Sequence, residues 1–343
     1  MTRSPPSCTP AEPAVYLALT PEQRQRQDQL RALLDERMPE SVVRELMADP
    51  VGDDPVLWPD VASLAWSDDP AEVAAAFEVL GERLYVGPFL ASVMSSALLA
   101  DAGARVAVAT ADESGVWTPS GVTVDPSGRA TGAKSFVVDG MTAQRLLIFG
   151  MRGGASCVVA VEADAPGLTR VPTPALDQTR KLARVELTDV PGTVLALDSD
   201  RALEELRLVT HAAVAAEQVG CAQGAFDVAL AYARQRQQFG RVIGSYQAVK
   251  HRFAELVLLI ENARAAAYHA LLTVAPGAVS HARIVSTQAA LEAAEWCVQV
   301  QGGQGFRWDN VAHLYLKRAK ATQLLFGDPS LERERLAASL GLV

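Results

Sequence analysis

The stretch that decides the fold is "RALEELRLVTHAAVAAEQVGCAQGAFDVALAYARQRQQFG", residues 201–240. Asp198 and the two residues after it supply an N-cap, and small and apolar residues then recur at helical spacing, which predicts one helix of about 35 residues. Three more helical patterns follow it in residues 245–272, 279–301 and 311–326. Four long helices with alanine-rich faces predict a C-terminal four-helix bundle, residues 199–343, which we expect to pack against other subunits as well.

The residues before this bundle divide into two regions. Residues 14–104 predict an N-terminal helical domain, in which Thr20 opens a capping box ahead of Pro21. From residue 105 to 198 the chain carries at least six short runs rich in β-branched residues, which predict a small antiparallel β-barrel or sandwich. The proline-rich residues 1–13 are expected to form a flexible tail. The predicted fold class is therefore α+β multidomain, with helices, then a β-domain, then a helical bundle.

Composition excludes several classes of protein. The 343 residues are 49% hydrophobic with a mean hydropathy of +0.11, yet no uncharged apolar stretch reaches the length of a membrane helix and no secretory signal is present. We therefore expect a cytoplasmic protein without a membrane partner. The net charge of -9 argues against a nucleic-acid partner. The histidines and cysteines show no metal-binding spacing, so no metal is expected, and reduced thiols are expected at Cys8, Cys157, Cys221 and Cys297.

Two polar clusters interrupt the predicted bundle, each where a long helix ends. The first, "RQQFG", contains Arg236, Gln238 and Phe239, and the second, "QVQGG", contains Gln299 with the Gly302–Gly303 pair. An arginine fork and bare glycine amides both suit a pyrophosphate, and an aromatic ring can wall an adenine or a ribose. Each cluster taken singly is also typical of a solvated helix cap.

Together these clusters resemble the flavin-dependent acyl-CoA dehydrogenases. The resemblance runs from about residue 57 to 328 and is strongest in "YARQRQQFGRVIGSYQAVKHRFAEL" and "QGGQGFRWDNVAHLYLKRAKA". Segments such as "AAEQVG" are similar to actinobacterial members of lipid and sterol side-chain oxidation, which makes a steroid or another bulky acyl-CoA a candidate substrate. In that family one subunit's RxxFG and QxxGG motifs hold the adenine-diphosphate end of its neighbour's FAD. By resemblance these roles fall to a set of six residues: Arg236, Gln238, Phe239, Gln299, Gly302 and Gly303.

The reaction of that family needs a base to remove the substrate α-proton. The resemblance places Phe326 where the usual glutamate stands, and Thr210 where other members carry it. Glu217 is a weak fallback base, about two helical turns after Thr210, although a structural glutamate paired with a basic side chain is the favoured interpretation. Asp328 is a lower-ranked fallback. We therefore expect no catalytic residue in this chain.

Other family features of the reaction centre are also missing. The strand end that contacts the flavin ring is reduced to "TADESG", residues 110–115, and Val138 replaces a threonine that would hydrogen-bond flavin N5. A PExxGG loop is absent between Trp66 and Asp68. The diphosphate-side residues are retained while the flavin-ring side is lost. This division favours a non-catalytic subunit of an α2β2 heteromer, which completes the FAD site of a homologous subunit and uses electron-transfer flavoprotein as acceptor.

Two alternatives remain open at this point. A complete homomeric dehydrogenase would use Glu217 as its base. A scaffold protein would keep the fold without binding flavin in any assembly.

Overall fold

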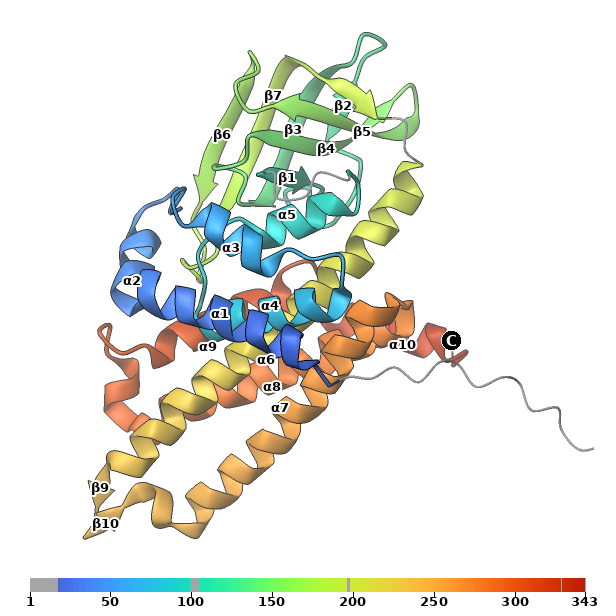
Figure 1. The fold of residues 1–343 in the computed structure, drawn as a ribbon. Coiled ribbons are helices and arrows are strands. Elements are labelled where there is room, and N and C mark those ends of the chain that lie inside the picture. The colour runs from blue at the N-terminus through green and yellow to red at the C-terminus, as the bar shows by residue number, and fades with distance from the viewer. Residues whose placement is uncertain (1–17, 100–104, 196–197, 328, 343) are drawn as a thin grey trace, which may run out of the picture.

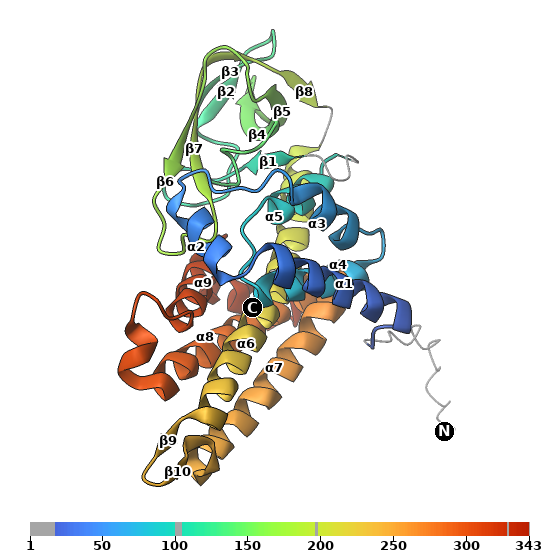
Figure 2. The ribbon, with the colours of Figure 1, turned by 60° about the vertical axis from the view of Figure 1, so that its left-hand side comes forward.

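The computed structural model describes residues 18–99, 105–195, 198–327 and 329–342. In both views the β-domain lies at one end of the molecule, the N-terminal helices lie beside its middle, and the long helices of the bundle extend to the opposite end (Figures 1 and 2). Helix α6 runs along most of this length, from the β-domain to the far tip. The order of helical, β and helical regions agrees with the predicted fold class.

Five helices form the N-terminal region: α1 (Pro21–Arg37), α2 (Glu40–Ala48), α3 (Trp58–Ala65), α4 (Pro70–Glu82) and α5 (Phe89–Ser96). The capping box at the start of α1 is confirmed, since the Gln23 amide N–H donates to Thr20 Oγ1 and the Thr20 amide N–H donates to Gln23 Oε1. These two bonds satisfy backbone donors that the first helical turn leaves free. The expected tail, residues 1–13, and Cys8 lie outside the described residues.

The β-domain is one sheet of eight strands: β1 (Val106–Ala109), β2 (Val122–Val124), β3 (Arg129–Val138), β4 (Arg145–Arg152), β5 (Ala155–Glu162), β6 (Leu168–Thr173), β7 (Leu182–Pro191) and β8 (Thr193–Leu195). The strands follow the order β6-β7-β3-β2-β4-β5-β8, and β1 also pairs with β4. The expectation of a purely antiparallel sheet is wrong, because β4 pairs in parallel with β1 and with β2. The remaining pairs of this sheet are antiparallel.

The C-terminal bundle contains the four predicted long helices: α6 (Ser199–Gln235), α7 (Gln247–Thr273), α8 (Pro276–Gln301) and α9 (Ala312–Leu324). Asp198 caps α6, as predicted, by accepting a hydrogen bond from the Arg201 amide N–H. A fifth helix, α10 (Pro329–Ser339), was not expected. The short strands β9 (Gln237–Gln238) and β10 (Arg241–Val242) form a hairpin, which η1 (Ile243–Ser245) connects to α7, and η2 (Gly302–Phe306) follows α8.

The three regions share two hydrophobic cores. One continuous core contains residues of the N-terminal helices, such as Phe77, of the bundle, such as Val219, and of one face of the sheet, such as Phe149. The other lies within the sheet and includes Ile148 and Val185. The N-terminal helices and the bundle therefore stabilise each other directly, and the sheet contributes one face to their core while it also has an interior of its own.

Helices α4 and α6 approach closely because glycine occupies their crossing. A Cβ atom added to Gly220 of α6 would lie 1.8 Å from the Glu78 carbonyl oxygen, and one added to Gly81 of α4 would lie 2.0 Å from the Glu217 carbonyl oxygen. Both opposing atoms belong to the backbone, so no side-chain rotation could relieve the overlap. Glycine at these two positions fixes the distance between the N-terminal region and the bundle.

Candidate functional site

The segments expected at the reaction centre meet in one pocket, here called the junction pocket. It has a volume of about 280 Å³ and lies between the sheet, α5 and the end of α9. Its walls include Thr110 and Ser114 of the "TADESG" segment, Val138 of β3, and Phe326 after α9. Segments separated by up to about 200 residues are therefore brought together as the resemblance implies.

No ionisable side chain is present among the described residues that line the junction pocket. Phe326 occupies the wall where the resemblance implies a base, and its ring lies 5.3 Å from the Trp117 ring in an edge-on arrangement. Thr210 is completely buried and is not part of the lining. Asp328, the lower-ranked fallback base, lies outside the described residues. The described lining offers no group that can accept a proton from a substrate.

Glu217 lies in a separate buried cluster of charges. Its Oε1 accepts a 2.7 Å hydrogen bond from Arg318 Nη1, and its Oε2 accepts one from Arg180 Nη2. A cavity of about 10 Å³, which is the size of a single water, lies beside it. Both carboxylate oxygens are thus engaged with arginines, and the adjoining space is too small for an acyl chain. The part of Glu217 in catalysis stays a prediction, and this geometry supports the structural interpretation.

Arg318 is the centre of this cluster, which joins all three regions of the chain. Besides Glu217 of α6, its guanidinium donates to Thr179 Oγ1 and to the Tyr85 carbonyl oxygen, and its Nε lies 2.7 Å from Asp177 Oδ2. Only 2% of the Arg318 surface is exposed. A buried charge is tolerated when it is paired and fully hydrogen-bonded, as it is here.

Asp139 lies beside the same cluster, at the end of β3. Burial raises the pKa of its carboxyl to about 7, although the nearby Arg180 and Arg318 charges act in the opposite direction. Its φ of 51° places it in the left-handed region, which aspartate tolerates better than most residues.

Lys134 holds the "TADESG" segment against the sheet. Its side chain is buried in β3, and its ammonium donates to the carbonyl oxygens of Thr110, Thr118 and Ser120. Burial lowers the pKa of this ammonium to about 8. Three carbonyl partners are the full donor capacity of a lysine, so this side chain fixes the wall of the junction pocket that contains Thr110.

The "RQQFG" cluster forms the hairpin at the tip of α6 and α7 (Figures 1 and 2). Arg236 ends α6 with an exposed side chain that forms no ion pair within the described residues. Gln238 is exposed, and its carbonyl oxygen accepts a 3.1 Å hydrogen bond from Tyr246 Oη. Phe239 is 94% exposed at a φ of 51°. An arginine and an aromatic ring are therefore exposed on the surface of the hairpin.

The second cluster is the turn that joins α8 to η2. Gly302 has a φ of 58°, and a Cβ atom added to Gly302 or to Gly303 would meet nothing within 4 Å. Gln299 is exposed, whereas Gln301 is buried and accepts a 2.7 Å hydrogen bond from Asn310 Nδ2. The buried Gln301 therefore stabilises the turn through its hydrogen bond to Asn310, while the backbone of the two glycines is exposed.

These residues fit the diphosphate end of FAD in chemical type. An unpaired guanidinium and uncovered glycine backbone suit phosphate oxygens, and the exposed Phe239 ring suits a flat base. The hairpin and the turn follow different helices, α6 and α8, and neither contributes a residue to the junction pocket. The two clusters therefore suit a nucleotide that binds on the surface of the bundle and not one inside the junction pocket.

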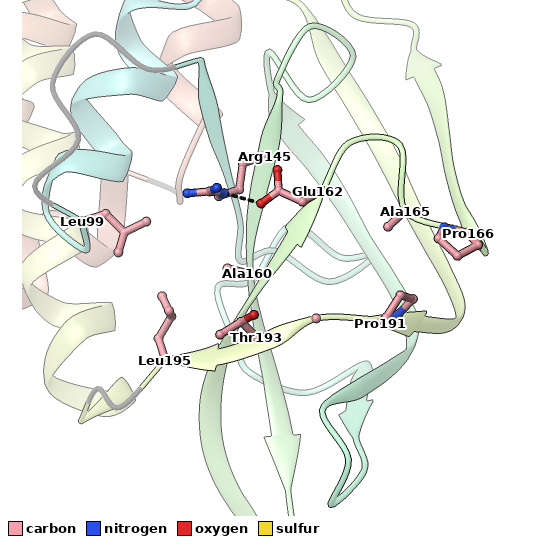
Figure 3. A pocket seen from close by; sticks show the side chains of 10 residues that line it. Leu99, Arg145, Ala160, Glu162, Ala165, Pro166, Pro191, Thr193 and Leu195 are labelled. Carbon is pink, nitrogen blue, oxygen red and sulfur yellow. Dashed lines mark hydrogen bonds and ion pairs between the residues drawn. The ribbon is translucent and has the colours of Figure 1, made fainter.

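A larger hollow, of about 610 Å³, lies beside strands β4, β5 and β8, and Leu99 of the N-terminal region also lines it (Figure 3). Arg145 of β4 and Glu162 of β5 form an ion pair in its wall, with a distance of 2.7 Å between Nε and Oε1. Leu99 and Leu195 lie on one side of it, and Pro166 lies on the other. None of the predicted site residues lines this hollow.

Several features of these sites were missed from the sequence. The roles of Lys134 and Arg318 depend on partners 24 and 101 residues away along the chain, so neither role can be read from the segment around the residue. The buried, free thiols of Cys157, Cys221 and Cys297 agree with the expected reduced state. None of the helices within the described residues combines the length and apolar character needed to cross a membrane.

Comparison with known proteins finds related sequences over most of the chain. Residues 202–341 match the family model of the acyl-CoA dehydrogenase C-terminal domain. Acyl-CoA dehydrogenase IpdE2 of Mycolicibacterium smegmatis is 29% identical over 329 residues, which cover 90% of this chain and 96% of the relative. Acyl-CoA dehydrogenase FadE34 of Mycobacterium tuberculosis is 34% identical over 257 residues, which cover 72% of this chain but only 35% of that protein.

Solved structures share the whole fold. The ChsE4-ChsE5 complex from Mycobacterium tuberculosis contains a chain that matches with a TM-score of 0.84 and 22% identity, over 96% of this chain and 100% of that one. Butyryl-CoA dehydrogenase from Megasphaera elsdenii matches with a TM-score of 0.83 and 19% identity, over 94% and 99% of the two chains. A further match is the Tcur3481-Tcur3483 steroid ACAD variant, with a TM-score of 0.82 and 23% identity, over 93% and 98%.

Proposed function

Because the chain belongs to the acyl-CoA dehydrogenase family, we propose that it is the non-catalytic subunit of a heteromeric, FAD-dependent acyl-CoA dehydrogenase. A homologous subunit supplies the flavin-ring site and the base, in an assembly with two copies of each chain. This chain completes the cofactor site in trans.

One observation carries the proposal: the described lining of the junction pocket has no ionisable group, while the diphosphate-type residues remain exposed on the bundle. Random loss of function would not remove one half of a site and preserve the other. Glu217 does not restore the missing half, because Arg180 and Arg318 engage both of its oxygens. These contacts oppose a homomeric enzyme that uses Glu217 as its base.

Each retained residue has a separate role in the proposed site. Arg236 would pair with the diphosphate through its guanidinium fork, and the Gly302 and Gly303 backbone would offer amide groups to it. Phe239 walls the adenine, while the Gln238 and Gln299 amides hydrogen-bond the ribose or the diphosphate. Bound FAD supplies hydride acceptance in the α,β-desaturation of an acyl-CoA thioester.

Similarity to known structures supports a proposal for the substrate, and the family resemblance supports one for the acceptor. Two of the structural neighbours are each named after two proteins, Tcur3481-Tcur3483 and ChsE4-ChsE5. The first of these is called a steroid ACAD. We therefore propose a bulky acyl-CoA, such as one with a steroid side chain, as the substrate of the assembly. Electron-transfer flavoprotein is the proposed acceptor.

The direct test is to purify the chain alone and together with a homologous subunit from the same genome that retains a base. We expect the lone chain to be free of flavin. The co-expressed complex should be yellow and should desaturate an acyl-CoA with an artificial electron acceptor. Stoichiometric FAD and turnover in the lone chain would overturn the proposal, and a stable complex that contains flavin only at sites remote from this chain would favour the scaffold alternative.

Replacing Arg236 with alanine in the complex should weaken FAD binding. Loss of a charge-assisted phosphate contact costs on the order of 2 kcal/mol, which corresponds to about a 30-fold higher dissociation constant. The measurement is the release of flavin as the complex is diluted in buffer without denaturant, and flavin fluorescence reports the released fraction. Arg234→Ala is the matched control, since Arg234 is also exposed in the last turn of α6. Equal flavin retention in both variants would remove Arg236 from the site.

A further inference from the structure

Asp139 lies where the β-domain meets the bundle, and its carboxyl group has no cation of its own. The side chain is 6% exposed, and within the described residues no ion pair or hydrogen bond joins its two oxygens to another group. Its backbone is fixed on both sides, because its amide N–H donates to the Lys181 carbonyl oxygen and its carbonyl oxygen accepts from the Thr142 and Ala143 amides. The carboxyl group cannot reach solvent without breaking these bonds.

The Asp139 side chain lines the small cavity beside the Arg318 cluster. Arg180, Glu217 and Arg318 line the same space, which has a volume of about 10 Å³ and can hold a single water. A hydrated metal cation does not fit in this volume, and the two guanidinium groups would repel a bare one. Neither bulk solvent nor a metal ion can therefore neutralise an ionised Asp139.

The charges around this cavity do not balance when every carboxyl group is ionised. Arg318 forms ion pairs with Asp177 and Glu217, and Arg180 forms a second pair with Glu217. Two cations are thus matched by two carboxylates, and Asp139 would add a third negative charge without a partner. A buried, unpaired ion is costly, and a carboxyl group avoids this cost when it keeps its proton.

The other titratable groups around Asp139 do not supply the missing charge. Arg105 forms an ion pair with Asp53, and the Lys181 ammonium donates to two backbone carbonyl oxygens at the end of α2. Tyr85 lines the cavity as a neutral phenol, because burial raises its pKa. The pKa of the Asp139 carboxyl agrees with this geometry, since burial raises it to about 7 despite the neighbouring arginines.

We propose that Asp139 holds a proton in the folded chain and that loss of this proton, as the pH rises, weakens the contact between the β-domain and the bundle. Asp139 and Arg180 stand on the side of the β-domain, and Glu217 and Arg318 on the side of the bundle. The proton therefore controls whether the two regions meet as a balanced or an unbalanced set of charges. The inference does not rest on FAD or on the heteromer, because every group belongs to this chain.

The direction of the pH effect depends on which state binds the proton more tightly. An aspartate in an unfolded chain has a pKa of about 3.9, whereas the pKa of Asp139 in the folded chain is about 7. Between these two values the folded state holds the proton and the unfolded state does not, so stability falls as the pH rises. The contribution is fully present below about pH 4 and is lost as the pH rises through about 7.

The test compares the urea unfolding constants of the full-length wild-type chain and Asp139→Asn from about pH 5 to about pH 8. Asparagine has the shape of the protonated carboxyl group and tolerates the positive φ of this position. We expect the wild-type constant, divided by that of Asp139→Asn, to rise by up to about tenfold per pH unit and to level off near pH 8, because a single proton is lost.

Asp189→Asn is the matched control. Asp189 also has a positive φ, of 54°, but its side chain is 69% exposed and pairs with Arg129 at the surface. The same substitution is therefore made at the same backbone conformation without burial. The ratio of the wild-type constant to the Asp189→Asn constant should not change over this pH range.

Carbon-13 NMR reports the proton directly. With aspartate labelled at its carboxyl carbon, the wild-type chain should show a resonance that titrates near pH 7, and Asp139→Asn should lack it. The wild-type titration keeps the inference testable even when the variant does not fold.

The inference is wrong if the ratio for Asp139→Asn does not change with pH, or if Asp189→Asn gives the same slope. It is also wrong if no aspartate carboxyl of the wild-type chain titrates near neutral pH. None of these measurements involves flavin, so none of them bears on whether the chain completes a partner's FAD site.

Discussion

Replacing Gly220 with alanine is expected to destabilise the protein by about 3 kcal/mol or more, at the upper end of the cost of overpacking a core. The added Cβ would lie 1.8 Å from the Glu78 carbonyl oxygen and 2.8 Å from the Glu82 amide nitrogen. Both atoms belong to α4, so the helix axis itself must move. The gain in helix propensity from glycine to alanine, about 1 kcal/mol, is already included in this expectation.

The measurement is the free energy of unfolding in urea, followed by circular dichroism. Gly303→Ala is the control, because its added methyl group meets nothing within 4 Å, and its unfolding free energy should change by less than about 0.5 kcal/mol. If Gly220→Ala were as stable as the wild-type chain, the close crossing of α4 and α6 would be incorrect.

Arg318→Met should cost about 3–5 kcal/mol of unfolding free energy, because it removes the cation from a buried cluster of charges. Methionine fills a similar volume, but Glu217 and Asp177 would each lose a partner inside the protein. Arg318→Lys should fall between the wild-type chain and the methionine variant, since lysine keeps the charge and loses the planar fork that reaches Glu217, Thr179 and Tyr85.

The control for charge removal is Arg201→Met at the surface. Arg201 pairs with Glu205 one turn along α6, and its side chain is 76% exposed. An exposed pair of this kind contributes at most about 0.5 kcal/mol. If Arg318→Met and Arg201→Met lost the same unfolding free energy, the buried ion pairs of Arg318 would contribute no more to stability than an exposed pair.

The fold could be predicted largely because local patterns determine its helices. The Thr20 and Asp198 caps and the long period of α6 specify where helices begin without any knowledge of their neighbours. The parallel pairing of β1 with β4 could not be predicted, because strand composition does not reveal which strands become neighbours or in which direction. The helix α10 was missed because its residues "LERERLAAS" lack a strong apolar period.

The candidate site shows the same limit. The alignment of Val138 and Phe326 with a family motif correctly placed both residues in one pocket. A structural Glu217 paired with a basic side chain was the favoured interpretation, but its partners could not be named, because Arg180 and Arg318 lie 37 and 101 residues away along the chain. The positive φ of Phe136 is likewise invisible in the sequence, since phenylalanine is not a residue that signals a turn.

The shared core of the N-terminal helices and the bundle has a consequence for how the protein is made. When helices α4 and α5 leave the ribosome, the apolar surface that packs against α6 in the folded protein has no partner, because α6 begins only at Ser199. The sheet, which has its own interior, can form meanwhile. The nascent chain therefore carries an uncovered helical segment through the synthesis of about 100 residues, at 5–20 residues per second for some 5–20 s, and we expect it to recruit a holding chaperone during that interval.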